Sequence, residues 1–110
     1  MDILQVPYTT ISWPEVLETN HPGETGQATW KTVEKGNIRV RLVTYSPGYL
    51  ADHWCHRGHV IHILSGEMIS ELKDGSKTAM KAGMTYMMSN DPGNPHRSYT
   101  ESGVTLFIVD

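Results

Sequence analysis

Four of the six histidines of this chain, and its only cysteine, lie within ten consecutive residues. Side chains alternate between the two faces of a strand, so His53 and Cys55 share a face if residues 50–55 form a strand. A tight turn at residues 56–58 would then bring His59 opposite this pair. The spacing therefore predicts two imidazoles and one thiol within a few ångströms of one another.

Another histidine, His96, stands about forty residues later, after Gly93-Asn94-Pro95, which predicts a rigid loop. Imidazole and thiolate suit zinc, iron, nickel or copper better than magnesium or calcium. We predict one divalent transition metal, zinc, iron or nickel, held by His53, Cys55, His59 and His96, and no organic cofactor. Its affinity should depend on pH, because the thiol must lose a proton and the imidazoles must be neutral.

Other interpretations of these residues stay open. The four side chains could form a hydrogen-bonded polar interior without a metal, although burying such donors without partners is costly. Cys55 could be a small buried apolar residue or a reactive thiol beside the metal. His62 falls on the opposite strand face from His59, which indicates a surface histidine.

The elements that must position these residues are short strands, because turn signals recur every 8–12 residues between β-branched and aromatic segments. The expected strands are residues 28–34, 38–45, 50–55, 59–64, 67–72, 77–80, 84–88, 96–100 and 104–109. Many short, evenly spaced strands predict an all-β fold, either an antiparallel sandwich or a small barrel. The sequence has no internal repeat and no linker, so nothing in it indicates a second domain.

Only one segment favours a helix. Ser12-Trp13-Pro14-Glu15 offers an N-cap serine, an early proline and a glutamate at the capping-box position. About two turns could follow before Asn20-His21-Pro22-Gly23 ends them. We expect residues 1–110 to form one domain, with residues 1–25 as an N-terminal arm that packs on a barrel of residues 26–110.

The spacing of the polar cluster matches a known motif. The first cupin motif runs glycine, five residues, His-x-His, three or four residues, glutamate, six residues, glycine. In this chain Gly48 is followed after four residues by His53, Cys55 takes the place of the second histidine, His59 that of the glutamate, and Gly66 that of the last glycine. The donor set thus changes from three nitrogens and an oxygen to three nitrogens and a sulfur.

The second cupin motif, Pro-x-Gly-x-x-His followed by an asparagine, is matched by Gly93 and His96, with Pro92 beside the glycine and Thr100 in the asparagine place. Residues 30–110 therefore resemble a small single-domain cupin. Residues 45–55 and 96–98 are similar to the cupin-fold group with an Asp-His-Cys-Trp type motif, a group without an assigned reaction. The resemblance implies a double-stranded β-helix, or jelly-roll, barrel.

Further side chains could line a pocket inside such a barrel. Arg41 shares a strand face with Tyr45, and an inward arginine would anchor a carboxylate, whereas an outward one would lie on the outer sheet face or in a dimer contact. Met84, Tyr86 and Met88 also share a face. They could simply fill the core, but the resemblance implies that their strand lines the cavity.

Composition narrows the class of protein. The chain has 110 residues and a net charge of −3, which argues against nucleic-acid binding, and no apolar run approaches the roughly 18 residues of a membrane span. A single cysteine and the lack of a secretory signal favour the cytoplasm. The arm at residues 3–11 suits pairing with a second copy, so we expect a homodimer.

The sequence thus predicts a small cupin that binds a divalent transition metal and a small organic ligand or substrate. No catalytic residue is assigned. If the protein is an enzyme, the resemblance implies dioxygenase- or isomerase-like chemistry, and fold alone does not choose between them. The alternative is a binding or sensing module without catalysis, with or without a metal, and a metal-stabilised accessory protein is a third interpretation.

Overall fold

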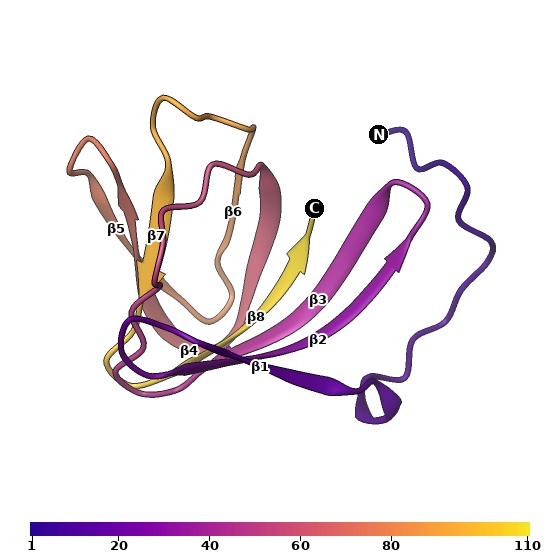
Figure 1. Cartoon of the computed structure of the whole chain (residues 1–110), viewed down its shortest axis with the longest axis horizontal. Coiled ribbons are helices and arrows are strands. Elements are labelled where there is room, and N and C mark those ends of the chain that lie inside the picture. The colour runs from indigo at the N-terminus through magenta and orange to yellow at the C-terminus, as the bar shows by residue number, and fades with distance from the viewer.

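A computed structural model describes residues 1–110, which form eight strands and one short 3₁₀ helix (Figure 1). In chain order the elements are η1 (Trp13–Glu15), β1 (Glu18–Pro22), β2 (Gln27–Lys35), β3 (Ile38–Tyr45), β4 (His59–Leu72), β5 (Lys77–Lys81), β6 (Thr85–Met88), β7 (His96–Tyr99) and β8 (Val104–Val109). No helix is both long enough and apolar enough to cross a bilayer.

All strand pairs are antiparallel, and the long strand β4 joins two sheets. The first half of β4 lies between β8 and β6, and its second half lies between β7 and β5. The order β1-β2-β3-β8-β4 completes the larger sheet. In Figure 1 the two sheets stand as facing walls, with β5 and β7 on one side and β8, β3 and β2 on the other. The expected all-β antiparallel fold is confirmed.

Alternating apolar residues build the core between the walls, as the period of a strand requires. The buried members are Val43, Ile61, Ile63, Met68, Met80, Val104, Leu106 and Ile108. Three of them, Ile63, Leu106 and Val43, are buried almost completely. These side chains fill the closed end of the barrel, so the polar residues of the same strand faces are left for the open end.

The first prediction concerns this core. Replacing Ile63, which is 0% exposed, by alanine should lower the free energy of unfolding by about 2–5 kcal/mol, because it removes buried methylene groups and leaves a cavity. Urea unfolding measures the loss. The neighbouring Leu64 is 48% exposed, so Leu64→Ala should change stability by no more than about 0.5 kcal/mol. Equal losses in the two variants would contradict this placement of the core.

The expected strand at residues 50–55 is wrong. Only Leu50 and Cys55 form isolated bridges, to Tyr99 and His96 of β7. Leu50 and Cys55 are five positions apart, whereas their partners Tyr99 and His96 are only three positions apart. Two residues between Leu50 and Cys55 must therefore lie outside the strand pairing. The side chains in the middle of the segment therefore sit on a loop and do not alternate between two faces.

The expected turn at residues 65–66, between two separate strands, is also wrong. The chain runs through it as the single strand β4, whose pairing with β8 shifts register between Ile63 and Ser65. Gly66 has a φ of 79°, which favours glycine, and a side chain there would collide with the carbonyl oxygen of Gly103. The glycine thus marks a bulge that bends β4 from one sheet into the other.

The expected two-turn helix near residue 12 is wrong as well. Ser12 makes no side-chain cap, the helix is only the three residues of η1, and Val16 is already extended. Residues of the expected second turn instead belong to β1. The open edge of β2 offers backbone hydrogen-bond partners to all five β1 residues, Glu18 to Pro22. The segment before η1 lies apart from the barrel along most of its length in Figure 1. Near its start, the Leu4 N–H donates a hydrogen bond to Oδ1 of Asn37 (2.8 Å), and Nδ2 of Asn37 donates one to the Asp2 carbonyl (2.7 Å).

Candidate functional site

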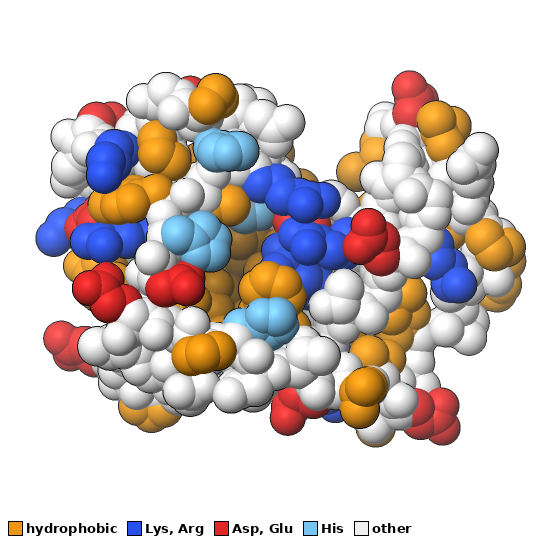
Figure 2. All heavy atoms as spheres, viewed as in Figure 1, with side chains coloured by type: hydrophobic (Ala, Val, Ile, Leu, Met, Phe, Trp, Pro, Cys, Tyr) orange, Lys and Arg blue, Asp and Glu red, His pale blue; other side chains and the backbone are white.

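A cavity of about 250 Å³ opens between the two sheets, above the apolar core. Its walls are Trp30, Arg39, Arg41, Tyr45, Tyr49, Ala51, His53, Cys55, Arg57, His59, Ile61, Tyr86, His96, Arg97, Ser98, Ile108 and Asp110. Figure 2 shows a hollow with an apolar floor, with histidines and Lys or Arg side chains around its rim. All four predicted metal ligands, and the predicted pocket residues Arg41, Tyr45 and Tyr86, line this one cavity.

Two histidines meet inside the cavity. His59 begins β4 and His96 begins β7, and their Nε2 atoms lie 2.8 Å apart. The residue His96 is only 4% exposed, and its backbone exchanges two hydrogen bonds with Cys55, at 2.7 and 2.8 Å. The bridge to Cys55 therefore fixes β7 against the loop before β4 and sets the position of the His96 ring.

The outer nitrogen of His59 faces a carboxylate that sequence reasoning missed. Asp110 follows β8, its side chain is fully buried, and its Oδ2 lies 3.5 Å from Nδ1 of His59. A signal was available, because Asp110 continues the inward alternation of Leu106 and Ile108 along β8. An inward arginine on the neighbouring strand also requires a buried partner.

Three arginines surround this carboxylate. Arg39 donates two hydrogen bonds, from Nε to Oδ1 (2.8 Å) and from Nη2 to Oδ2 (3.0 Å), and Arg41 donates one from Nη2 to Oδ2 (2.9 Å). Nε of Arg57 lies 3.5 Å from the same Oδ2. Burial alone would raise the pKa of Asp110, but the Arg39 hydrogen bond and the guanidinium charges lower it to about 2. The carboxylate is therefore ionised at neutral pH.

Both histidines are neutral at neutral pH. Burial lowers the pKa of His96 to about 4, with a further contribution from His59. Burial also lowers the pKa of His59, although the Asp110 carboxylate opposes this effect. A proton on Nδ1 of His59, facing Asp110, leaves Nε2 of that ring as a lone pair in the cavity. His96 can then donate from its own Nε2, while the buried Nδ1 atoms of both rings have no hydrogen-bond partner.

The other two predicted ligands do not join this pair to form a cluster of three. The His53 side chain is 75% exposed, and its Nδ1 contacts Oδ1 of Asp52 at 2.6 Å. Cys55 is a free, half-buried cysteine. No group of three or more His, Cys, Asp and Glu side chains lies close enough together to hold a metal ion. The structure thus supplies two converging imidazoles, and a third donor would have to come from the loop that carries His53 and Cys55.

The predicted pocket residues divide between three places. Tyr45 stacks on Tyr49 with ring centroids 4.1 Å apart. Burial raises the pKa of Tyr45, and it raises the pKa of Tyr86 to about 12, so the phenols of Tyr45 and Tyr86 stay protonated. Met88 lies along a different depression, which also contacts the first residues of the chain. Met84 lines a third depression on the smaller sheet.

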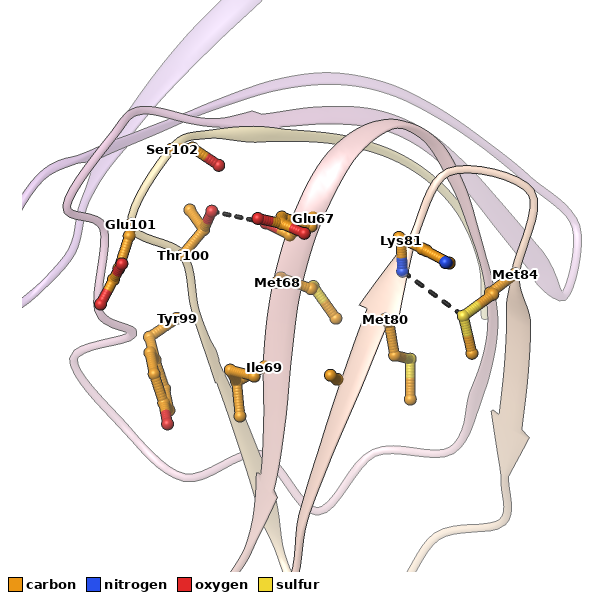
Figure 3. A pocket seen from close by; sticks show the side chains of 11 residues that line it. Glu67, Met68, Ile69, Met80, Lys81, Met84, Tyr99, Thr100, Glu101 and Ser102 are labelled. Carbon is orange, nitrogen blue, oxygen red and sulfur yellow. Dashed lines mark hydrogen bonds between the residues drawn. The ribbon is translucent and has the colours of Figure 1, made fainter.

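The depression that contains Met84 is larger than the cavity, about 490 Å³, but it lacks the metal-ligating and anion-binding side chains of the cavity. Figure 3 shows Met68, Ile69, Met80 and Met84 along it, with Glu67 at one end. It has no histidine, cysteine or arginine in its walls. The polar cavity between the sheets is therefore the candidate site, although it is smaller.

Comparisons with solved structures place the fold among the cupins. A cupin described as RmlC-like, from Shewanella frigidimarina, matches with a TM-score of 0.71 and 14% identity, over 96% of this chain and 92% of that chain. A predicted oxalate decarboxylase from Thermotoga maritima matches with a TM-score of 0.73 and 14% identity, over 92% and 96%. The predicted cupin-type barrel is thereby confirmed.

A third neighbour is named with a metal. Fe(II)-HppE with the alternative substrate (S)-1-HPP matches with a TM-score of 0.75 and 10% identity, over 94% of this chain and 60% of that one. No protein-family model matches the chain. No curated protein matches it either. At these identities the likeness shows the fold alone, and the resemblance to the Asp-His-Cys-Trp group stays a prediction.

Proposed function

We propose that this chain is a small cupin that binds a small organic ligand inside its barrel, beside a divalent transition metal held by His59 and His96. The observation that carries the proposal is the 2.8 Å approach of the two Nε2 atoms within a polar cavity. Two nitrogens that each lie about 2.0–2.1 Å from one ion are about 2.9 Å apart at a right angle and about 3.3 Å apart at a tetrahedral angle, so the two rings are close to the spacing of adjacent ligands. Cys55 or His53 would supply the third donor.

The surroundings of His59 support this assignment. Histidine ligands commonly donate their outer N–H to a carboxylate, which fixes the ring and its tautomer. Asp110 stands on that side of His59 at 3.5 Å, a distance longer than a hydrogen bond, and its carboxylate is itself fixed by Arg39 and Arg41. The low pKa of both histidines keeps them in the neutral form that binds metal. When bound, such a metal would supply Lewis acidity toward a ligand oxygen.

Metal content tests the proposal. Protein purified without chelator from metal-supplemented growth should carry about one equivalent of zinc, iron or nickel by mass spectrometry. His96→Ala should reduce this at least tenfold, because it removes one of two buried donors. Cys55→Ser and His53→Ala, measured separately, identify the third donor.

His62→Ala is the matched control, because the His62 ring is bonded to Thr85 on the other strand face (2.7 Å). This variant should keep the full metal content. Protein that carries no metal under any growth condition would contradict the proposal, and so would a His96→Ala variant that keeps its metal.

A binding module without a metal is the second candidate. It is supported by the absence of a third converging donor and by the His59–His96 contact, which two neutral rings can satisfy as a hydrogen bond. Metal-free protein that still binds small ligands, with no turnover in an oxygen-consumption screen against small thiols, phenols and keto acids, would favour it.

A further inference from the structure

We propose that the ligand of this cavity is a small organic anion, a carboxylate with an apolar body, bound at the guanidinium groups of Arg57 and Arg41. This inference rests on the proposed function and names the class of ligand that the site would take. It follows from the charge, the free donors and the apolar walls of the cavity.

The cavity carries excess positive charge. Four arginines and one carboxylate line it, and Arg97 is already paired with Glu71 at 3.0 Å. Three arginines therefore share one buried carboxylate, Asp110, and Arg39 also lies near the exposed Glu34, so at least one guanidinium charge in the cavity has no carboxylate partner. The whole chain has a net charge of −3, so the cavity has the opposite sign to the protein. A cleft of one sign with low-dielectric walls attracts small ions of the other sign.

Two of these guanidinium groups have donors to spare. Nε of Arg41 is buried without a hydrogen-bond partner, and this guanidinium is held 4.4 Å from the centre of the Trp30 ring. Arg57 is half-exposed, and its 3.5 Å distance to Asp110 is longer than a hydrogen bond. A planar guanidinium with free N–H groups matches the two oxygens of a carboxylate.

Beside the arginines and histidines, the cavity also has apolar and aromatic walls, and it is narrow. Ile61, Ile108, Tyr45 and Tyr86 line it below the arginines. Its volume of about 250 Å³ is below the roughly 300–1,000 Å³ of sites for drug-sized ligands. The site therefore fits a short molecule with the carboxylate at one end and a compact apolar body at the other. Inorganic phosphate meets only the first of these conditions.

Calorimetry with matched probes tests the inference. Acetate and benzoate should each bind at least tenfold more tightly than acetamide and benzamide, which keep the shape but lose the charge. Benzoate should bind more tightly than acetate or inorganic phosphate. Arg57→Gln should weaken benzoate binding at least fivefold, and should fold normally because the side chain is half-exposed. Lys73→Gln removes the same charge outside the cavity and should change benzoate binding less than twofold.

Asp110→Ala provides a second, opposite test, because it removes the internal carboxylate and leaves room for an external one. Acetate should raise the melting temperature of this variant more than that of the wild type, and acetamide should not. If the variant does not fold, the Arg57 comparison decides alone. Equal binding of acids and amides, no binding of any probe, or an unchanged Arg57→Gln variant would overturn the inference.

Metal content measured on the same preparations separates this inference from the proposed function. Protein that holds metal but binds acids no better than amides overturns the anion inference and leaves the metal site standing. Protein that binds benzoate through Arg57 but never holds metal supports the inference and overturns the metal assignment.

Discussion

Asp110→Ala should lower the free energy of unfolding by about 3–5 kcal/mol, because it leaves buried arginines without their counter-charge. The Asp110 side chain is fully buried, and those of Arg39 and Arg41 are 18% and 8% exposed, so water cannot replace the lost carboxylate well. The ion pairs also join β3 to the end of β8. Denaturant unfolding of wild type and variant at pH 7 measures the loss.

Asp52→Ala is the matched control for this prediction. Its carboxylate contacts His53 at 2.6 Å, but the two side chains are 57% and 75% exposed. Exposed ion pairs contribute at most about 1 kcal/mol, so this variant should be nearly neutral. A loss of less than about 1 kcal/mol for Asp110→Ala would show that the arginines find other partners, and the description of the buried cluster would then fail.

The alternation of residue types was enough to predict most strands of the barrel. Val43, Ile61 and Leu106 lie inward, as the period of two requires, because the only way to bury these side chains is to close one sheet on the other. His59 and His96, two of the four predicted metal ligands, lie with their ring nitrogens 2.8 Å apart, and their role in binding a metal stays a prediction.

Local signals failed where pairing between strands decided the structure. Ser12 and Glu15 have the residue types of a capped helix, yet the free edge of β2 pairs with the residues that follow. The unequal spacing of the Leu50 and Cys55 bridges also depends on β7, which a local reading of residues 50–55 does not include. The strand expected over residues 50–55 puts His53 on an inward face, but the loop that forms there leaves its side chain largely in solvent.

The partner of the inward arginines required reasoning about charge as well as period. The sequence predicts that Arg41 can line a pocket, but its position alone does not distinguish a ligand carboxylate from an internal one as its partner. Because a buried guanidinium needs a counter-charge in the folded protein itself, an acidic residue is expected at an inward position of a neighbouring strand. Asp110 is that residue, two positions after Ile108.

The buried side chains of His96, His59 and Asp110 make the stability of the metal-free protein sensitive to acid. His96 has a pKa lowered from 6.5 to about 4, so between these values the unfolded chain binds a proton that the folded chain does not. Stability must then fall as the pH drops from about 6.5 to about 4, and His59, whose pKa is also lowered, adds to the loss. Asp110 acts in the same direction at lower pH, between 3.8 and about 2.

At about 1.4 kcal/mol per pKa unit, His96 alone accounts for about 3 kcal/mol lost between pH 7 and pH 4. Urea unfolding of chelator-treated protein at pH 7, 5.5 and 4 measures this slope. His96→Gln keeps a polar side chain but cannot titrate in this range, so it should flatten the slope, whereas His62→Gln on the other strand face should not. If the wild type and the His96→Gln variant had the same pH dependence, the His96 ring would be accessible to water and the burial described for it would be wrong.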